Sequence, residues 1–278
     1  MAGKQSLKDM MKGQLSQSEL SLLPTSFDIV GDILIFADFP EKLEKKEKII
    51  GEEILKNFKH LRVVCKKTGS YSGKYRTPIL RIIAGERRKE TTHRENGVIV
   101  KLHVQDVYFS PRLAHERERI NKEIKEGEEV LVMFSGSGVY PLNMAKNTKA
   151  KKIYGIEVNP KAHKYATENL KLNKAENIML VLGDAKIVLP KMRKSFDRVL
   201  MPLPKSSEDF LGIAIPKVKK NGILHFYDFS HEKNMSESAE KVIRACAIAK
   251  RSADIFRIVK CGQYGPGKYR VCVDAKIF

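Results

Sequence analysis

From about residue 110 to residue 230, short apolar segments alternate with segments of helical composition. The apolar segments are rich in Val and Ile and mostly end at Gly, Asn or Asp, which is typical of buried strands. Strands that alternate with helices favour a parallel, doubly wound sheet with helices on both faces. The expected strands are EEVLVMF, KKIYGIEV, NIMLVLGD, FDRVLMPL and NGILHFYDF.

The carboxyl-terminal segment breaks this alternation. FRIVKCGQYGPGKYRVCVDAKIF contains two strand-like runs around Gly265-Pro266-Gly267, with no helix between them. Gly and Pro favour a tight turn, so we expect an antiparallel hairpin at the edge of the sheet.

Residues 25–105 have a different pattern. FDIVGDILIFADF, HLRVVCKK, ILRIIAG and GVIVKLHV are short apolar runs bounded by turn residues, and the segment 41–58 has a helical composition. Its expected apolar face consists of Ile49, Ile50, Ile54 and Leu55. We therefore expect an N-terminal segment (1–22), a small basic α+β domain (23–105) and a larger α/β domain (106–278).

The composition favours a soluble protein that binds a polyanion. Lys and Arg outnumber Asp and Glu by 52 to 33, which gives a net charge of +19 and a pI near 9.7. Residues 61–101 carry eleven Lys or Arg against three acids. Such an excess is typical of proteins that bind nucleic acid. No run approaches the ~18 apolar residues that cross a membrane, and four scattered cysteines indicate free thiols in a reducing cytoplasm.

A glycine-rich turn follows the first strand of the larger domain. Gly136 and Gly138 in FSGSG allow the backbone to pass close to a ligand, and Glu157 ends the next strand nineteen residues after Gly138. A carboxylate at this position can accept hydrogen bonds from both hydroxyls of a ribose. The spacing therefore predicts a nucleoside site, beside a helix that Asn159 can cap.

The third glycine of a dinucleotide fingerprint is replaced by Pro141, which disfavours a pyrophosphate. An adenosyl cofactor without phosphates fits better, and S-adenosylmethionine is the common one. Asp184, at the end of the third strand, can accept a hydrogen bond from the adenine amino group, and it can also cap the helix that follows.

The fourth strand ends in two prolines. In DRVLMPLPK, Pro202 and Pro204 remove backbone donors and fix a rigid turn. They are interpreted either as a strand terminator or as a rigid wall beside a reacting base.

The segment YFSPRLAHERERI places Glu116 among Arg112, Arg117 and Arg119. Arg112 and Glu116 are four residues apart, so an ordinary surface ion pair worth about 0.2–0.5 kcal/mol is one interpretation. The other is that Glu116 is a base held in a positively charged site.

Taken together, the motifs resemble one family. YRTPILRIIAGE, ETTHRENG, VYFSPRLAHERERI, MFSGSGVYPL, IYGIEVNP, DRVLMPLPK and GILHFYDF occur in an order that resembles the archaeal and eukaryotic tRNA (guanine-N1)-methyltransferases. The resemblance covers roughly residues 25–278. It implies a class I (Rossmann-like) S-adenosylmethionine-dependent domain acting on the purine at tRNA position 37. It also implies a partner recognised at the anticodon stem-loop, no membrane, and a monomeric enzyme.

The family pattern implies a role for individual residues. The glutamate proposed to remove the proton of guanine N1 falls on Glu116, and an arginine that stabilises charge on O6 falls on Arg76. The implied site residues are, for catalysis, Glu116, Arg76, Pro202 and Pro204; for the cofactor, Phe134, Gly136, Gly138, Glu157, Asn159, Asp184 and Leu203; and for the substrate, Tyr108, Arg112 and, on a phosphate, Arg117. No metal is implied.

Two positions depart from the family pattern. Val132 stands where an acid is usual, and Pro202 stands where Asn usually precedes Leu-Pro. The related wybutosine-pathway enzyme transfers a 3-amino-3-carboxypropyl group from the same cofactor and lacks both the Arg of SPRL and the Pro-Leu-Pro. Arg112 and Pro204 therefore favour methyl transfer.

Three alternatives are kept: that wybutosine-pathway transferase, a non-catalytic tRNA-binding relative and, disfavoured by Pro141, a nicotinamide dehydrogenase. The chain is also expected to begin after the additional N-terminal domain that some members use to contact the tRNA elbow. Recognition would then depend more on the anticodon stem.

Overall fold

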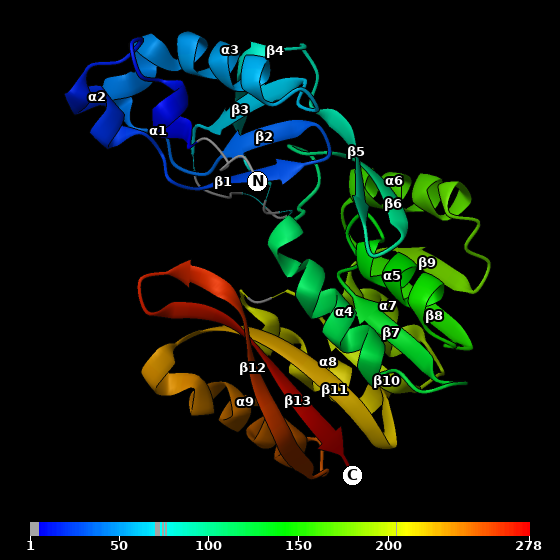
Figure 1. The fold of residues 1–278 in the computed structure, drawn as a ribbon. Coiled ribbons are helices and arrows are strands. Elements are labelled where there is room, and N and C mark those ends of the chain that lie inside the picture. The colour runs from blue at the N-terminus through cyan, green and yellow to red at the C-terminus, as the bar shows by residue number, and fades with distance from the viewer. Residues whose placement is uncertain (1–5, 70–72, 74, 76, 204) are drawn as a thin grey trace. The chain divides into compact units, whose positions relative to one another are not determined.

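The computed structural model describes residues 6–69, 73, 75, 77–203 and 205–278. The chain divides into two units (Figure 1). Unit 1 comprises residues 1–94 and 100–111, and unit 2 comprises residues 95–99 and 112–278. The division near residue 111 lies beyond the boundary expected at 105, because the loop after the second hairpin strand stays with unit 1.

Unit 1 is a four-stranded sheet with helices packed on it (Figure 1). The strand order is β1-β2-β3-β4, with β2 and β3 parallel and the other neighbours antiparallel. The strands are β1 (Phe27–Val30), β2 (Ile33–Phe36), β3 (Val63–Lys67) and β4 (Leu80–Gly85). The helices are α1 (Leu7–Met10), α2 (Gln17–Leu22), the 3-10 helix η1 (Glu41–Lys46) and α3 (Glu47–Asn57).

The core of unit 1 includes part of the N-terminal segment. Met11, Leu15 and Leu20 are buried in the same apolar cluster as Phe36 and Ile50. These side chains help to exclude water from the sheet, so residues 6–22 pack as part of unit 1.

A hairpin links the two units along the chain. Strands β5 (Glu90–Glu95) and β6 (Val98–His103) form a two-stranded sheet whose tip, residues 95–99, belongs to unit 2. The sequence did not predict β5, because ETTHRE lacks an apolar alternation. The face that it buries carries Thr91 and Glu95, which are polar.

Unit 2 is built on a seven-stranded sheet of order β12-β13-β11-β10-β7-β8-β9. The five strands from β11 to β9 in this order are parallel, and β13 runs antiparallel to β11 and β12. The strands are β7 (Glu129–Met133), β8 (Lys152–Glu157), β9 (Ile178–Leu182), β10 (Phe196–Met201), β11 (Val218–His231), β12 (Ala253–Gly265) and β13 (Lys268–Ile277). The predicted parallel sheet and terminal hairpin are confirmed.

Helices cover both faces of this sheet. α4, α5 and α6 lie on one face, and α7, α8 and α9 on the other (Figure 1). Their bounds are α4 (Ala114–Glu123), α5 (Val139–Asn147), α6 (Pro160–Leu172), α7 (Ala185–Lys191), α8 (Leu211–Ala214) and α9 (Met235–Ile248). Short 3-10 turns complete the unit: η2 (Pro111–Leu113), η3 (Ser207–Phe210), η4 (Ile215–Lys217) and η5 (Glu232–Asn234).

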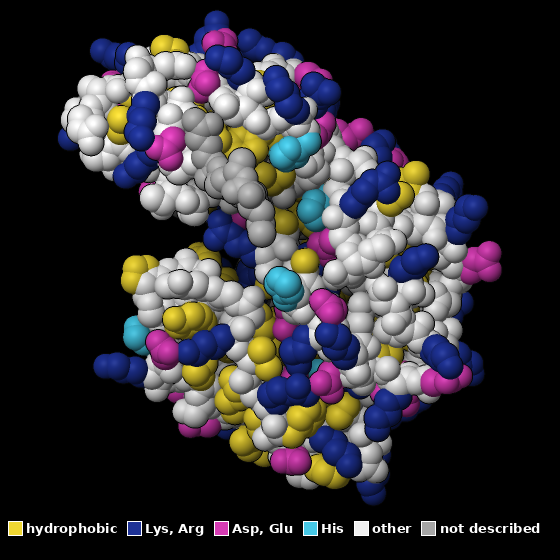
Figure 2. Space-filling model, in the orientation of Figure 1, with side chains coloured by type: hydrophobic (Ala, Val, Ile, Leu, Met, Phe, Trp, Pro, Cys, Tyr) yellow, Lys and Arg dark blue, Asp and Glu magenta, His cyan; other side chains and the backbone are white. Residues whose placement is uncertain are grey.

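The surface carries the basic excess in dispersed form. Dark-blue Lys and Arg side chains are spread over the visible faces of both units in Figure 2. Within the described residues, no helix combines the length and apolar character needed to span a membrane.

Candidate active site

The loop after β7 adopts backbone conformations that favour glycine. Gly136 and Gly138 have φ of 58° and 82°, and Gly138 immediately precedes helix α5. A Cβ on Gly138 would lie 3.2 Å from the Cβ of Ala166 in α6. The turn is therefore tight on one side and bends the backbone toward the carboxyl end of the sheet, where ligands bind in doubly wound folds.

Glu157 is held at the end of β8 by this loop. One carboxylate oxygen accepts from the N–H of Gly136 at 2.7 Å, and the other accepts from the N–H of Asn159 at 2.8 Å. Burial raises the pKa of Glu157, and the backbone donors oppose that rise. Each carboxylate oxygen offers two lone pairs, so Glu157 can also accept from two vicinal hydroxyls.

Two buried hydroxyls of the same loop have no hydrogen-bond partner among the described residues. They are Ser135 Oγ and Ser137 Oγ, in side chains that are 3% and 1% exposed. Pro141 is buried in the first turn of α5, where a dinucleotide fold needs glycine. Unpaired polar atoms, a close backbone turn and a ribose-accepting carboxylate together suit an adenosyl group such as S-adenosylmethionine.

The helix caps near this loop are as predicted. Asn159 accepts from the N–H of Lys161 at 3.0 Å at the start of α6, and Asp184 accepts from the N–H of Lys186 at 2.9 Å at the start of α7. The cap interpretation of Asp184 is confirmed, and its second carboxylate oxygen leaves room for the expected adenine contact.

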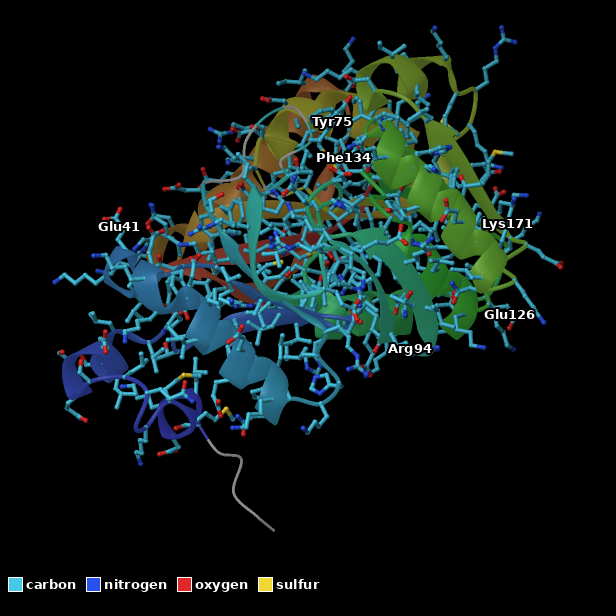
Figure 3. All side chains as sticks on the ribbon, turned by 90° about the horizontal axis from the view of Figure 1, so that it is seen from above. Glu41, Tyr75, Arg94, Glu126, Phe134 and Lys171 are labelled. Carbon is cyan, nitrogen blue, oxygen red and sulfur yellow. The ribbon has the colours of Figure 1, made fainter. Side chains whose placement is uncertain are left out.

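The wall expected from the fourth strand is partly described. The N–H of Leu203 donates to the carbonyl of Met201 at 2.7 Å, which turns the chain tightly at Pro202, whereas Pro204 lies outside the described residues. Phe134 packs edge to face against Phe210, with ring centroids 4.8 Å apart. Phe134 is half-buried, whereas Lys171 and Glu126 lie at the periphery of unit 2 in Figure 3.

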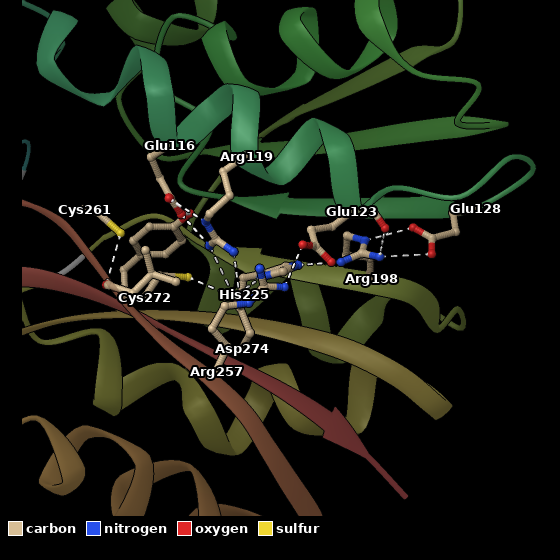
Figure 4. A network of polar contacts seen from close by, with 12 residues as sticks. Glu116, Arg119, Glu123, Glu128, Arg198, His225, Arg257, Cys261, Cys272 and Asp274 are labelled. Carbon is tan, nitrogen blue, oxygen red and sulfur yellow. Dashed lines mark hydrogen bonds and ion pairs between the residues drawn. The ribbon is translucent and has the colours of Figure 1, made fainter.

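Glu116 is not on a solvated helix face. Its side chain is 3% exposed, and its ion-pair partner is Arg119, not the Arg112 that helical spacing suggested. Arg119 donates from Nε to Oε2 at 2.8 Å and from Nη2 to Oε1 at 2.7 Å, and the hydroxyl of Tyr227 donates to Oε1 at 2.6 Å. Figure 4 shows Glu116 and Arg119 between helix α4 and the sheet.

Behind Arg119, a chain of buried polar groups crosses the sheet (Figure 4). Arg119 Nη1 donates to Asp274 at 2.6 Å, and Asp274 Oδ1 lies 2.6 Å from His225 Nδ1. Arg198 Nη1 lies 2.6 Å from His225 Nε2 and also pairs with Glu128. Burial lowers the pKa of His225, so the imidazole is neutral, with its proton on Nδ1 facing Asp274.

These groups also include His225, Cys272 and Asp274, which are close enough to hold a metal ion. However, the Asp274 carboxylate already faces Arg119 at 2.6 Å and Arg257 at 3.2 Å. Two cations against one carboxylate disfavour a third, so we assign this cluster to ion pairing.

Arg117 lies in the interior, contrary to its expected contact with phosphate. Its side chain is 2% exposed and pairs with Glu95 through Nε and Nη2, both at 2.5 Å. Its guanidinium also lies over the ring of Tyr140, 5.6 Å from the centroid. A guanidinium enclosed in this way does not face an RNA phosphate.

The remaining expected substrate residues differ in their placement. Arg112 is exposed, just before α4 in unit 2, whereas Tyr108 belongs to unit 1 and is 37% exposed. Arg76 lies outside the described residues. Val132, which replaces the family's acid, is fully buried in β7 between Gly155 and Leu200 of the neighbouring strands.

The groups that surround Glu116 and Arg119 were not predicted from the sequence. Tyr227 and His225 belong to GILHFYDF, which was assigned to a strand only, and Asp274 belongs to the terminal hairpin. A buried strand that contains His, Tyr and Asp among apolar residues was the available signal, because buried polar groups need partners.

The fold and the site define a Rossmann-like transferase that uses an adenosyl cofactor. The defining features are the doubly wound sheet with its antiparallel terminal hairpin, the glycine turn after β7, and a carboxylate that can accept hydrogen bonds from a ribose. The chain belongs to the TRM5/TYW2 methyltransferase family. The family model described as TRM5/TYW2 methyltransferase domain matches residues 91–255, and the one described as TYW2 N-terminal domain matches residues 7–88.

Two curated relatives represent two activities. The tRNA (guanine(37)-N(1))-methyltransferase Trm5b of Pyrococcus abyssi is 39% identical over 264 residues, which cover 92% of this chain and 76% of that protein. The tRNA(Phe) (4-demethylwyosine(37)-C(7)) aminocarboxypropyltransferase of Methanocaldococcus jannaschii is 33% identical over 248 residues, covering 89% of this chain and 96% of that protein.

Solved structures agree with this placement. Trm5b from Pyrococcus abyssi superposes with a TM-score of 0.85 at 37% identity, covering 95% of this chain and 78% of that one. A complex of aTrm5 with tRNALeu gives 0.86 at 30% identity, covering 98% and 78%. TYW2 of M. jannaschii in complex with AdoMet gives 0.71 at 27% identity, covering 91% and 99%.

Proposed function

We propose that this protein transfers a methyl group from S-adenosylmethionine to N1 of the guanine at position 37 of tRNA. The observation that carries the proposal is the buried carboxylate of Glu116, which accepts hydrogen bonds from Tyr227 and Arg119. Among the described residues, Oε2 accepts one hydrogen bond only, so its second lone pair can accept a proton. The similarity to Trm5b and to the aTrm5–tRNALeu complex supports the choice of tRNA.

The cofactor residues are proposed from the loop geometry. Glu157 accepts the ribose hydroxyls, Gly136 and Gly138 give the close approach, and Asp184 contacts the adenine. Asn159, Phe134 and Leu203 complete the pocket. When bound, S-adenosylmethionine would supply an electrophilic methyl group attached to a sulfonium. The sulfur would leave as a neutral thioether.

Glu116 is proposed as the base because guanine N1 is protonated and is a poor nucleophile until that proton is removed. The proton moves from N1 to Oε2 of Glu116, the N1 lone pair forms the bond to the methyl carbon, and the carbon–sulfur bond breaks. A positioned base contributes about 10²–10⁴-fold to such a step. Arg76 is proposed to stabilise the negative charge that moves onto O6. Arg112 and Tyr108 are proposed to hold the base, with Pro202 and Pro204 as the wall beside it.

We further propose a monomer that recognises the anticodon stem-loop in the cytoplasm. The four cysteines are free, which suits a reducing compartment. A single mass at the monomer value in light scattering checks the oligomeric state, and binding of an isolated anticodon stem-loop checks the recognition element.

The test of the base is Glu116→Gln, which keeps shape and removes proton affinity. Single-turnover methylation of unmodified tRNA is expected to fall about a hundredfold or more, with tRNA and cofactor binding nearly unchanged. Glu118→Gln is the matched control, since Glu118 lies on the same helix, is half exposed and pairs with Lys122. A near-normal rate for Glu116→Gln at neutral pH removes Glu116 from this role.

The second candidate is aminocarboxypropyl transfer, which the M. jannaschii relative and the TYW2 N-terminal match favour. Unmodified and 4-demethylwyosine-containing tRNA are incubated with cofactor labelled on the methyl or on the carboxypropyl carbon. Transfer of the methyl label to unmodified tRNA supports the first candidate, and transfer of the carboxypropyl label to the 4-demethylwyosine-containing tRNA replaces it with the second.

A further inference from the structure

The two oxygens of Glu116 are not equivalent. Oε1 receives two donors, the hydroxyl of Tyr227 at 2.6 Å and Nη2 of Arg119 at 2.7 Å, whereas the one donor that the described residues give Oε2 is Nε of Arg119 at 2.8 Å. A carboxylate oxygen offers two lone pairs. Oε1 is therefore filled, and Oε2 is the atom that can accept a proton.

Arg119 divides its charge between two carboxylates. Besides Glu116, it donates to Asp274 from Nη1 at 2.6 Å and from Nη2 at 3.3 Å. Asp274 is fully buried and is held by His225 and Arg257, so it cannot turn away. Burial opposes the charge of Arg119, but its bonds to both carboxylates raise its pKa, and it stays protonated.

The ion-pair network around Glu116 has one negative charge in excess among the described residues. Its three cations face four anions, with His225 neutral, so the formal sum is 3 − 4 = −1. The cations are Arg119, Arg198 and Arg257, and the anions are Glu116, Asp274, Glu123 and Glu128. Transfer of one proton into this network therefore brings its formal charge to zero.

Other titratable groups near Glu116 do not change this sum. Burial raises the pKa of the Tyr140 and Tyr227 hydroxyls and of the Cys272 thiol, so they stay neutral. Arg117 on the same helix is matched by Glu95. The groups that interact with Glu116 are Arg119 from α4, Tyr140 from α5, Tyr227 from β11 and Cys272 from β13, and Asp274 from β13 acts on it through Arg119.

We propose that Tyr227 and Asp274 are positioning residues that set the proton affinity of Glu116 in opposite directions. The Tyr227 hydroxyl stabilises the carboxylate and fixes its plane, which lowers proton affinity and directs Oε2 to the substrate. Asp274 takes a share of Arg119, which keeps the carboxylate basic. This inference rests on the proposed function, because it concerns the base of that reaction.

The experiment measures single-turnover methylation of unmodified tRNA against pH, at saturating cofactor. Tyr227→Phe removes a donor to the anion, so the acid limb of the profile moves to higher pH by about half to one unit. Asp274→Asn leaves Arg119 wholly to Glu116, so the acid limb moves to lower pH and the plateau falls about tenfold or more. The dissociation constants for tRNA and cofactor stay within about twofold.

Two variants of the same sheet serve as controls. Tyr154→Phe removes a hydroxyl from β8, where the ring packs against Phe196, and Asp197→Asn removes a carboxylate that pairs with Lys219. Neither residue touches Glu116, so both pH profiles are expected to overlay the wild-type profile.

A Tyr227→Phe profile that overlays the wild type, or moves to lower pH, overturns the inference, and so does an upward shift in Asp274→Asn. If Asp274→Asn does not fold, Tyr227→Phe decides alone. A wild-type protein that methylates tRNA while Tyr227→Phe behaves like Tyr154→Phe rejects only this inference. A wild-type protein that transfers nothing to tRNA rejects the proposed function, and the inference with it.

Discussion

Two arginines on helix α4 have opposite surroundings although they are two residues apart. Arg117 forms a buried ion pair with Glu95, whereas Arg119 joins the proposed base, Glu116, to Asp274. Their positions differ because successive helical residues point about 100° apart. A run of charges such as HERER therefore contains residues with different roles.

Arg117 is predicted to be structural. Arg117→Met leaves Glu95 charged and buried without its main partner, which is expected to cost about 3–5 kcal/mol in the free energy of unfolding. Urea unfolding measures the loss, and the double variant Arg117→Met/Glu95→Leu should recover a large part of it. The prediction is contradicted if Arg117→Met has normal stability and its tRNA binding becomes less dependent on salt. That result would support a contact between Arg117 and an RNA phosphate.

Glu157 is predicted to bind the cofactor. Glu157→Ala removes a charged acceptor and should weaken S-adenosylmethionine binding by about 1.5–3 kcal/mol in calorimetry. Glu176→Ala, at an exposed position after α6, is the control. Because burial raises the pKa of Glu157, wild-type affinity should fall on acidification at a higher pH than an ordinary glutamate would give. If folded Glu157→Ala binds S-adenosylmethionine with unchanged affinity, the cofactor binds at another site.

At this scale, the sequence could identify residues whose role follows from chain spacing. Gly138 follows β7 and Glu157 ends the neighbouring strand β8, so their position at the same edge of the sheet was predictable. Tyr227 and Asp274 meet the helix that carries Glu116 only because β11 and β13 pair beneath α4, and their separation along the chain carries no signal of that contact.

Among the elements, the strands and helices of unit 2 were the most predictable. Asn159 and Asp184 mark the starts of α6 and α7 as expected, because a cap is a local interaction. Prediction was less successful where burial is polar or incomplete. Strand β5 buries Thr91 and Glu95, and Ile49, expected on the apolar face of α3, is 39% exposed.

The start of helix α5 gives a matched test of a backbone constraint. Gly138 and Gly127 share a φ of 82°, but a Cβ on Gly127 would meet open space, whereas a Cβ on Gly138 would lie 3.2 Å from Ala166. Gly127→Ala should cost about 1–2 kcal/mol for the left-handed conformation alone. Gly138→Ala should cost more in the free energy of unfolding, and should also weaken cofactor binding. Equal losses in the free energy of unfolding for the two variants, measured by thermal unfolding, would show that α5 and α6 move apart easily to accommodate the added Cβ.

For the whole molecule, not all of the 52 Lys and Arg residues are available to a ligand. In unit 1, Lys66 is buried against Glu44 and Glu47, and Arg88 pairs with Asp32. The basic stretch predicted from the sequence is therefore partly used inside the fold. Composition does not distinguish a cation that pairs internally from one that faces solvent. An RNA-binding surface therefore has to be located from the structure and not from the charge alone.

Arg87 and Arg94 are exposed and have no acidic partner in the part of the chain that the structure describes. If wild-type binding neutralises about five phosphates, the log–log slope of tRNA affinity against salt should be about −3.5 to −4.5. Arg87→Ala/Arg94→Ala should reduce its magnitude by about 0.7–0.9 for each phosphate that is no longer neutralised. The control Lys171→Ala/Lys174→Ala removes the same charge from the exposed end of α6. Equal slopes for the two double variants would mean that tRNA responds only to total charge, whereas a reduction confined to the arginine variant would locate a phosphate-binding surface on unit 1.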